Sequence, residues 1–258
     1  MKHLTKLFLA VATGMFALSC VTDATSDLGV KLGGGQVTEI TLSLEESRTQ
    51  LGEKADGVYP LYWSNGDVIS VNGITSGEAV ISESNPASAT FTIQGEVPTP
   101  YCIAYPAAPA GQVVFAETQV HAGGSTFSAG ASTMYGYGDA SGIQLKHLTG
   151  VLKFGITGST VLTKVQISTI DRAPIAGAFN IDFATGKLTA TEDSKYVINY
   201  EFPSTADADG FELSSEPKYL HITVPAGTYN DLYVTLYDKD GGVMFATIKA
   251  GDEKPLAV

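Results

Sequence analysis

Residues 152–167 read "LKFGITGSTVLTKVQI", and the spacing of apolar residues in this stretch determines the fold class. Leu152, Phe154 and Ile156 occupy every second position, and the period of two resumes from Val161 after a Gly-Ser-Thr break. This period places successive side chains on opposite faces of a sheet, whereas an amphipathic helix repeats every three or four residues. The stretch therefore predicts two β-strands separated by a turn.

The same alternation recurs along most of the chain. It is visible in residues 40–44, 101–105, 175–181, 232–236 and 243–245. Gly-containing loops of hairpin length connect alternating segments, as in "DFATGKL" at 182–188 and "YDKDGGV" at 237–243. No window shows the apolar spacing of an amphipathic helix. Short strands joined by such turns predict an all-β fold built from β-sandwiches.

The region after residue 36 is longer than one ordinary sandwich requires, so we expect two sandwiches in tandem. The break is expected at "GDASGIQ", residues 138–144, where small and turn-forming residues precede a new pair of strands. We predict an N-terminal β-sandwich domain at 37–142 and a C-terminal β-sandwich domain at 143–258.

The N-terminus has the features of an export signal. Lys2 and Lys6 accompany an apolar stretch at 7–18, which is shorter than the roughly 20 residues that cross a bilayer as a helix. Export, rather than a transmembrane anchor, is therefore expected.

A cysteine follows this apolar stretch. "ALSC" at 17–20 resembles the bacterial lipobox, so we predict a lipoprotein signal peptide at 1–19 and lipidation of Cys20. The acyl chains would hold the protein at a membrane, and the small, polar residues 20–36 would form a flexible tether. The alternative is an ordinary secretory signal cut a few residues later, with Cys20 incidental.

Composition narrows the possible partners. The chain has 27 acidic and 15 basic residues, a net charge of -12, and no cluster of Lys or Arg. Nucleic acid is therefore not an expected partner, and the charge favours solubility. If Cys20 is lipidated, Cys102 has no disulfide partner. We interpret Cys102 as a small core residue, because no neighbouring cation would lower its pKa and make it reactive.

Signals for catalysis are weak. The four histidines lack metal-ligand spacing, and no Gly-x-Ser-x-Gly motif is present. Asp238 and Asp240 in "DKDGG" are similar to part of a calcium loop, but a strand follows where further ligands would be needed, which favours a hairpin turn. We predict that the protein is not an enzyme and that it has no catalytic, cofactor-binding or metal site.

The single tryptophan has two interpretations. Trp63 lies in "YWSNGDVISVNG", residues 62–73. An exposed Trp63 could stack on a sugar, which would suit a surface carbohydrate-binding lipoprotein. A buried Trp63 would instead cap one end of a sandwich core, and this is the favoured interpretation.

Several segments together resemble a known family. They are "ITLSLEESRTQLG" at 40–52, "YWSNGDVISVNG" at 62–73 and "LKHLTGVLKFGITG" at 145–158, after a lipoprotein start. In this order and spacing they resemble the fimbrillin family of Bacteroidales, the Mfa-like and FimA-like fimbrial proteins.

The resemblance implies two transthyretin-like Greek-key β-sandwiches. It also implies a stalk, anchor or tip subunit of a fimbria on the outer membrane and cell surface. Expected partners are other fimbrial subunits, the outer membrane through the lipid, and a host or bacterial surface ligand. In polymerising members, a trypsin-like protease cuts after a basic residue near the N-terminus, and a strand from the next subunit fills the groove that this opens.

Arg48 is the candidate for this processing, because it follows the alternating strand "VTEITLSL" at 37–44. Release of that strand would uncover an apolar face and an unpaired edge. Arg48 could instead pair with acidic residues in a nearby loop, and Lys31 is a second possible cut. Little sequence follows the last expected strand at 243–248, so either the final strands act as donor or the subunit is a terminal or anchoring one.

Overall fold

The computed structural model describes residues 31–33, 37–44, 62–122, 128, 130–139, 143–203, 210–250 and 256–257. The predicted signal peptide, Cys20 and Arg48 lie outside the described residues. Within them every regular element is a β-strand, which confirms the predicted all-β class. In this described part, no helix could span a membrane.

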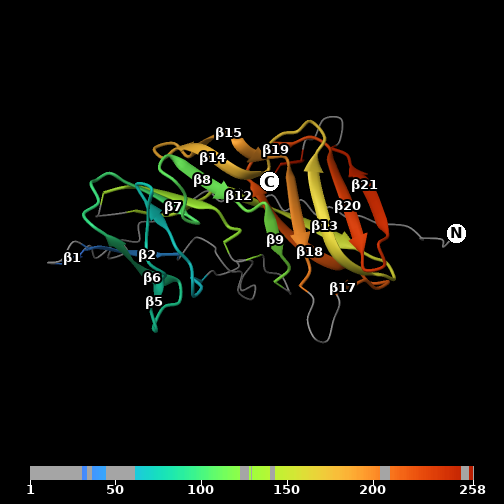
Figure 1. Ribbon diagram of the computed structural model, residues 1–258, viewed down its shortest axis with the longest axis horizontal. Coiled ribbons are helices and arrows are strands. Elements are labelled where there is room, and N and C mark those ends of the chain that lie inside the picture. The colour runs from blue at the N-terminus through green and yellow to red at the C-terminus, as the bar shows by residue number, and fades with distance from the viewer. Residues whose placement is uncertain are drawn as a thin grey trace.

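The N-terminal sandwich has two sheets that enclose an apolar core (Figure 1). One sheet has the order β1 (Lys31–Gly33), β2 (Val37–Ser43), β6 (Ser88–Gln94) and β5 (Val80–Ile81). The other has the order β11 (Lys146–His147), β10 (Met134–Gly138), β7 (Tyr101–Tyr105), β3 (Ser70–Val71) and β4 (Ile74–Thr75). Inward-facing residues of both sheets, such as Ile40, Phe91 and Ile103, are at most 1% exposed.

The C-terminal half has a second apolar core between a large and a small sheet. The large sheet has the order β21 (Val243–Ile248), β20 (Leu232–Asp238), β13 (Val161–Thr169), β16 (Val197–Glu201) and β9 (Thr118–Val120), with β17 (Phe211–Glu212) paired to β13. The small one joins β12 (Thr149–Ile156) to β18 (Lys218–Pro225), and β19 (Thr228–Tyr229) pairs separately with β22 (Leu256–Ala257).

A third sheet connects the two halves. It has the order β15 (Lys187–Lys195), β14 (Ala176–Asp182) and β8 (Gln112–Phe115), and its Phe115 and Phe179 form one apolar cluster with Ala104 and Tyr135 of β7 and β10. The strands β8 and β9 precede the predicted boundary at residue 142, yet they pair with β14 and β16 beyond it. Backbone pairing therefore runs across that position, and the division into domains at 142 stays a prediction.

Gln119 ties β9 to the opposite sheet. Its side-chain amide donates to the carbonyl oxygen of Thr223 at 2.7 Å and accepts the Thr223 N–H at 2.9 Å. Gln119 is 1% exposed, so it forms these two hydrogen bonds inside the core. The two sheets of the C-terminal half are hydrogen-bonded to each other through this side chain.

Both quoted hairpins are confirmed, since Asp182 pairs with Lys187 and Tyr237 pairs with Val243. The period of two that resumes at Val161 predicted that Val161, Val165 and Ile167 would all face the core, and this is wrong in part. The register with β20 shifts between Leu162 and Lys164, so Leu162 is buried and Val161 is only half-buried. Residues 31–33, predicted as tether, form β1 against β2.

Candidate functional site

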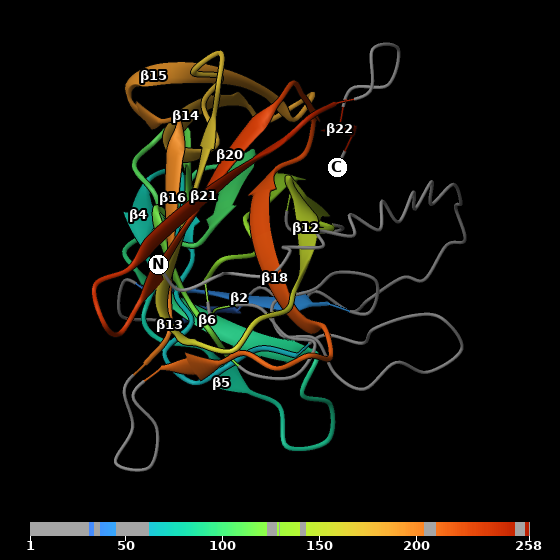
Figure 2. The same ribbon diagram turned by 90° about the vertical axis from the view of Figure 1, so that its right-hand side faces the viewer.

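The candidate site is the place that β2 occupies in the N-terminal sandwich. β2 pairs with β6 over seven residues, from Val37 opposite Gln94 to Ser43 opposite Ser88. β1 pairs with β2 over three residues and with no other strand in the described part of the chain. The views in Figures 1 and 2 place β2 and β6 side by side. The β1–β2 hairpin is therefore attached to the rest of its sheet along one edge of β6.

The inward side chains of this strand are almost completely buried. Ile40, Leu42 and Leu44 are 1%, 0% and 2% exposed, and they belong to the same apolar cluster as Trp63 and Phe91. Burial of each large aliphatic side chain contributes about 1.5 to 3 kcal/mol. The three together hold the strand with roughly 5 to 9 kcal/mol by the same estimate. A strand seated this way leaves a deep apolar groove when it is removed.

Polar contacts fix the register of β2. The Trp63 Nε1–H donates to the Leu42 carbonyl oxygen at 3.3 Å, and the Leu44 N–H donates to the Ala87 carbonyl oxygen at 2.7 Å. The hydroxyl of Ser43, by contrast, is buried without a hydrogen-bond partner among the described residues. A buried polar group left unpaired costs about 1 to 3 kcal/mol. Among the described residues, β2 is therefore well seated, but its Ser43 hydroxyl has no hydrogen-bond partner.

The turn at residues 64–67 follows Trp63 and is held by hydrogen bonds of Asp67. The Asp67 carboxylate accepts the Ser64 N–H at 2.7 Å and the Tyr105 hydroxyl at 2.7 Å. Burial raises the pKa of Asp67, although these two donors act in the opposite direction. Burial and the adjacent Asp67 charge raise the pKa of Tyr105.

Trp63 is a core residue, as the favoured interpretation predicted. It is 3% exposed, and its ring meets those of Phe91 and Tyr105 edge to face at centroid distances of 4.9 and 5.4 Å. The alternative in which Trp63 stacks on a sugar is therefore wrong for this structure, because no face of the indole is open.

Two other sequence predictions concern turns and thiols. The Asp238 carboxylate accepts the N–H groups of Asp240 and Gly242 at 3.0 and 2.6 Å, so "DKDGG" is a hairpin turn as predicted. Cys102 is half-buried against the cluster that joins the halves, and burial raises the pKa of its thiol.

Within the described ranges, no group of three or more His, Cys, Asp or Glu side chains is placed to hold a metal ion.

The remaining histidines serve the packing of the sheets. His121 Nδ1 lies 3.0 Å from the Tyr200 hydroxyl, and its ring packs against Phe202 and Phe211. His147 Nδ1 lies 3.2 Å from the Ser132 hydroxyl. Burial lowers the pKa of His121, and burial together with the nearby Lys153 charge lowers that of His221.

One feature was not evident in the sequence. β21 pairs only with β20 in the described structure, so its other edge is open. Its outer face carries Val243 and Phe245, which are 54% and 81% exposed. The alternation of 243–245 indicated a strand, but it could not indicate which face meets the core.

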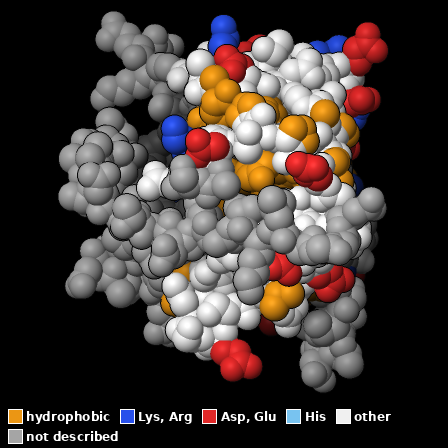
Figure 3. Space-filling view, turned by 90° about the vertical axis from the view of Figure 1, so that its left-hand side faces the viewer, with side chains coloured by type: hydrophobic (Ala, Val, Ile, Leu, Met, Phe, Trp, Pro, Cys, Tyr) orange, Lys and Arg blue, Asp and Glu red, His pale blue; other side chains and the backbone are white. Residues whose placement is uncertain are grey.

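The described residues at the end of the molecule that carries the N-terminal sandwich do not form a basic surface. Figure 3 shows acidic side chains around a group of hydrophobic side chains on the described part of this face, with few Lys or Arg side chains. This agrees with the net charge of -12 and offers no continuous surface for phosphate groups.

Comparisons with protein-family models, curated proteins and solved structures found no match to this chain. The functional assignment therefore depends on the residues and the geometry described above.

Proposed function

We propose that this protein is an exported, lipid-anchored subunit of a cell-surface fimbria of the fimbrillin type, joined to its neighbours by β-strand addition. The observation that carries the proposal is the attachment of the β1–β2 hairpin. This hairpin precedes Arg48, and its strands pair with the rest of the described protein only through β6. A single cut after Arg48 would turn it into a separate, replaceable peptide. Lipidation of Cys20 would hold the uncut subunit at the outer membrane, and the cut after Arg48 would separate the body of the subunit from its lipid.

Loss of the hairpin would leave a surface suited to another strand. The sheet would be reduced to β6 and β5, and the backbone groups of β6 that face β2 would be unpaired between Ser88 and Gln94. The apolar positions vacated by Ile40, Leu42 and Leu44 would open beside that edge. An incoming strand with apolar residues at alternate positions restores both the hydrogen bonds and the core.

The energetics allow exchange but not simple loss. The cut hairpin is still held by roughly 5 to 9 kcal/mol of side-chain burial. A donor that places a smaller or hydrogen-bonded residue at the position of Ser43 avoids the unpaired hydroxyl there. Assembly by this route depends on the concentration of a better-fitting strand. Two transthyretin-like Greek-key sandwiches are the finer fold that this proposal expects.

An arginine-specific protease tests the proposal, because the chain has only two arginines, Arg48 and Arg172. Cleavage after Arg48 should release the hairpin slowly and convert the monomer into oligomers of increasing size, measured by mass spectrometry and light scattering. Arg48→Lys should block both effects. Arg172→Lys is the matched control, because Arg172 lies in an exposed turn after β13, and this variant should still assemble. A product cut after Arg48 that has lost the hairpin and stays monomeric at all concentrations would contradict the proposal.

The alternative, a surface carbohydrate-binding lipoprotein, receives no support from Trp63. The observation in its favour is a hollow elsewhere in the protein that contains Tyr137 and Lys146.

A further inference from the structure

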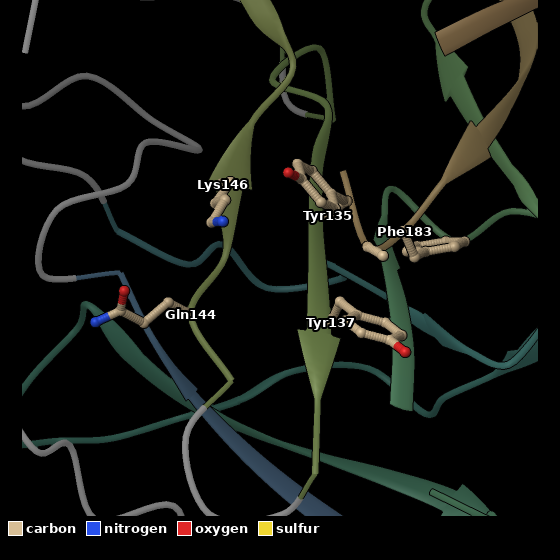
Figure 4. A pocket seen from close by; sticks show the side chains of 6 residues that line it. Tyr135, Tyr137, Gln144, Lys146 and Phe183 are labelled. Carbon is tan, nitrogen blue, oxygen red and sulfur yellow. The ribbon is translucent and has the colours of Figure 1, made fainter. Parts of the chain in front are cut away.

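A hollow of about 200 Å³ lies where the N-terminal sandwich meets the third sheet. Figure 4 shows its side chains, which come from three segments. Tyr135 and Tyr137 belong to β10, Gln144 and Lys146 come from the next segment and β11, and Phe183 and Ala184 come from the turn between β14 and β15. The hollow is separate from the groove of β2, so its role does not depend on strand exchange.

The floor of this hollow is rigid. Tyr135 and Phe183 are 6% and 8% exposed, and their ring centroids are 6.4 Å apart. The Tyr135 hydroxyl lies so close to Gly186 that a Cβ atom there would collide with it. The turn itself is held by Asp182, whose backbone oxygen accepts the Gly186 N–H at 2.7 Å and whose carboxylate accepts the Ala184 N–H at 3.0 Å. A ligand would therefore meet a preformed surface.

The rim provides three kinds of contact. Tyr137 is 46% exposed, and both Gln144 and Lys146 are exposed. Tyr135 is paired with Lys146 in the β10–β11 register, so both side chains are on the face that borders the hollow. No carboxylate among the described residues forms an ion pair with Lys146. The aromatic ring can contact the C–H face of a sugar, the amide can bind hydroxyl groups, and the ammonium group can bind an anion.

We propose that this hollow binds a single carboxylated sugar residue, a uronic or a sialic acid. Its volume of about 200 Å³ is smaller than the usual site for a drug-sized ligand, so it suits one ring rather than a chain. The ammonium group of Lys146 favours an acidic sugar over a neutral one. In a protein of net charge -12, one exposed lysine attracts one carboxylate but does not form the multiple phosphate contacts that nucleic acid needs.

The test is a chemical-shift titration of the isotope-labelled full-length protein with glucuronate, N-acetylneuraminate, glucose and acetate. The expected result is saturable shifts at the amides of 135–137, 144–146 and 183–186 with one or both sugar acids. The two acids distinguish a uronate-containing polysaccharide from a sialylated glycan as the natural source. Much weaker shifts are expected with glucose and acetate, since each has only part of the recognised chemistry.

Exposed substitutions separate the contributions. Lys146→Ala should weaken binding of the sugar acid about tenfold, the usual effect of losing one charge-assisted hydrogen bond, and should leave glucose unaffected. Tyr137→Ala should weaken acid and glucose alike. Lys239→Ala and Tyr233→Ala, at exposed positions of the β20–β21 hairpin, are matched controls and should bind as the unchanged protein does. No saturable shift at these amides, equal binding of glucose and the acids, or equal binding of acetate and the acids would overturn the proposal.

Discussion

The strands β2 and β21 contrast in how their two edges and faces are used. β2 lies between β1 and β6, and its inward side chains Ile40 and Leu42 are almost fully buried. β21 has a neighbour on one side only among the described strands, and Phe245 on its outer face is 81% exposed. Both are alternating segments in the sequence. The difference shows that the strand that the proposal makes replaceable is buried, whereas an edge strand of the other half is accessible.

The largest expected effect is on stability in β2. Leu42→Ala should lower the free energy of unfolding by about 2 to 5 kcal/mol, because it removes a buried side chain and leaves a cavity. The matched Phe245→Ala should change it by less than about 0.5 kcal/mol, since little contact is lost at an exposed site. Urea denaturation measures both. Equal losses in the two variants would remove the contrast between the strands.

Gln119 tests the connection within the C-terminal half. Gln119→Leu should destabilise the protein by about 1 to 3 kcal/mol, because the N–H and C=O of Thr223 lose their buried partner. Hydrogen exchange should become faster at Thr223. The exchange of β2 and β6 should change little, and a uniform increase over both halves would contradict a local role.

Lowering the pH from 7 to 5 should reduce the stability of the C-terminal half more than that of the N-terminal sandwich. The pKa values of His121 and His221 are lowered in the folded protein, by burial and, for His221, also by Lys153. Below the unfolded pKa of about 6.5, these histidines bind protons in the unfolded chain but not in the folded chain. The free energy of unfolding therefore falls as the pH falls from about 6.5 toward the folded pKa values. The pKa of Asp67 is raised instead, so its contribution to stability increases as the pH falls toward about 3.9.

Exchange protection measured at pH 7 and pH 5, corrected for intrinsic rates, should therefore decrease around β9, β16 and β18 more than around β3 and β7. The double variant His121→Gln and His221→Gln should reduce that decrease. A larger loss in the N-terminal sandwich would show that the titrating groups have been misassigned.

The smallest effect on stability is expected from a charge on the open edge. Phe245→Lys should leave the free energy of unfolding within about 0.5 kcal/mol of its original value and should reduce non-specific association at high concentration. Light scattering of uncut protein measures this. Unchanged association would show that the β21 edge is not the adhesive surface of the monomer.

Local sequence patterns predicted the strands well but not their partners. The period of two and the Gly-containing turns were enough to place the hairpins at 182–188 and 237–243, because adjacent strands and tight turns are specified locally. Trp63 is buried, as the favoured interpretation predicted, because a large aromatic side chain contributes most to stability when it packs in a core. The bulge at Leu162 was not predictable, since an extra residue in one strand is visible only when its partner β20 is known.

The unpredicted parts depend on contacts between distant segments. Gln119 and Thr223 are 104 residues apart, and neither belongs to a recognisable motif. The hollow at Tyr137 arises because the turn after β14 packs beside β10, which no local window reveals. Arg48 and Cys20 lie outside the described residues, so their proposed roles in processing and lipidation stay predictions from the sequence.

Binding of a synthetic peptide with the sequence of residues 37–44 tests the central claim most directly. The protein is cut after Arg48, the released hairpin is removed under mild denaturant, and the labelled peptide is added. The account predicts that the peptide binds the cut protein with protection of the β6 amides, does not bind the uncut protein, and loses binding when Ile40 and Leu42 are replaced by Asp. Equal binding to cut and uncut protein, or no binding to a folded cut protein, would contradict it.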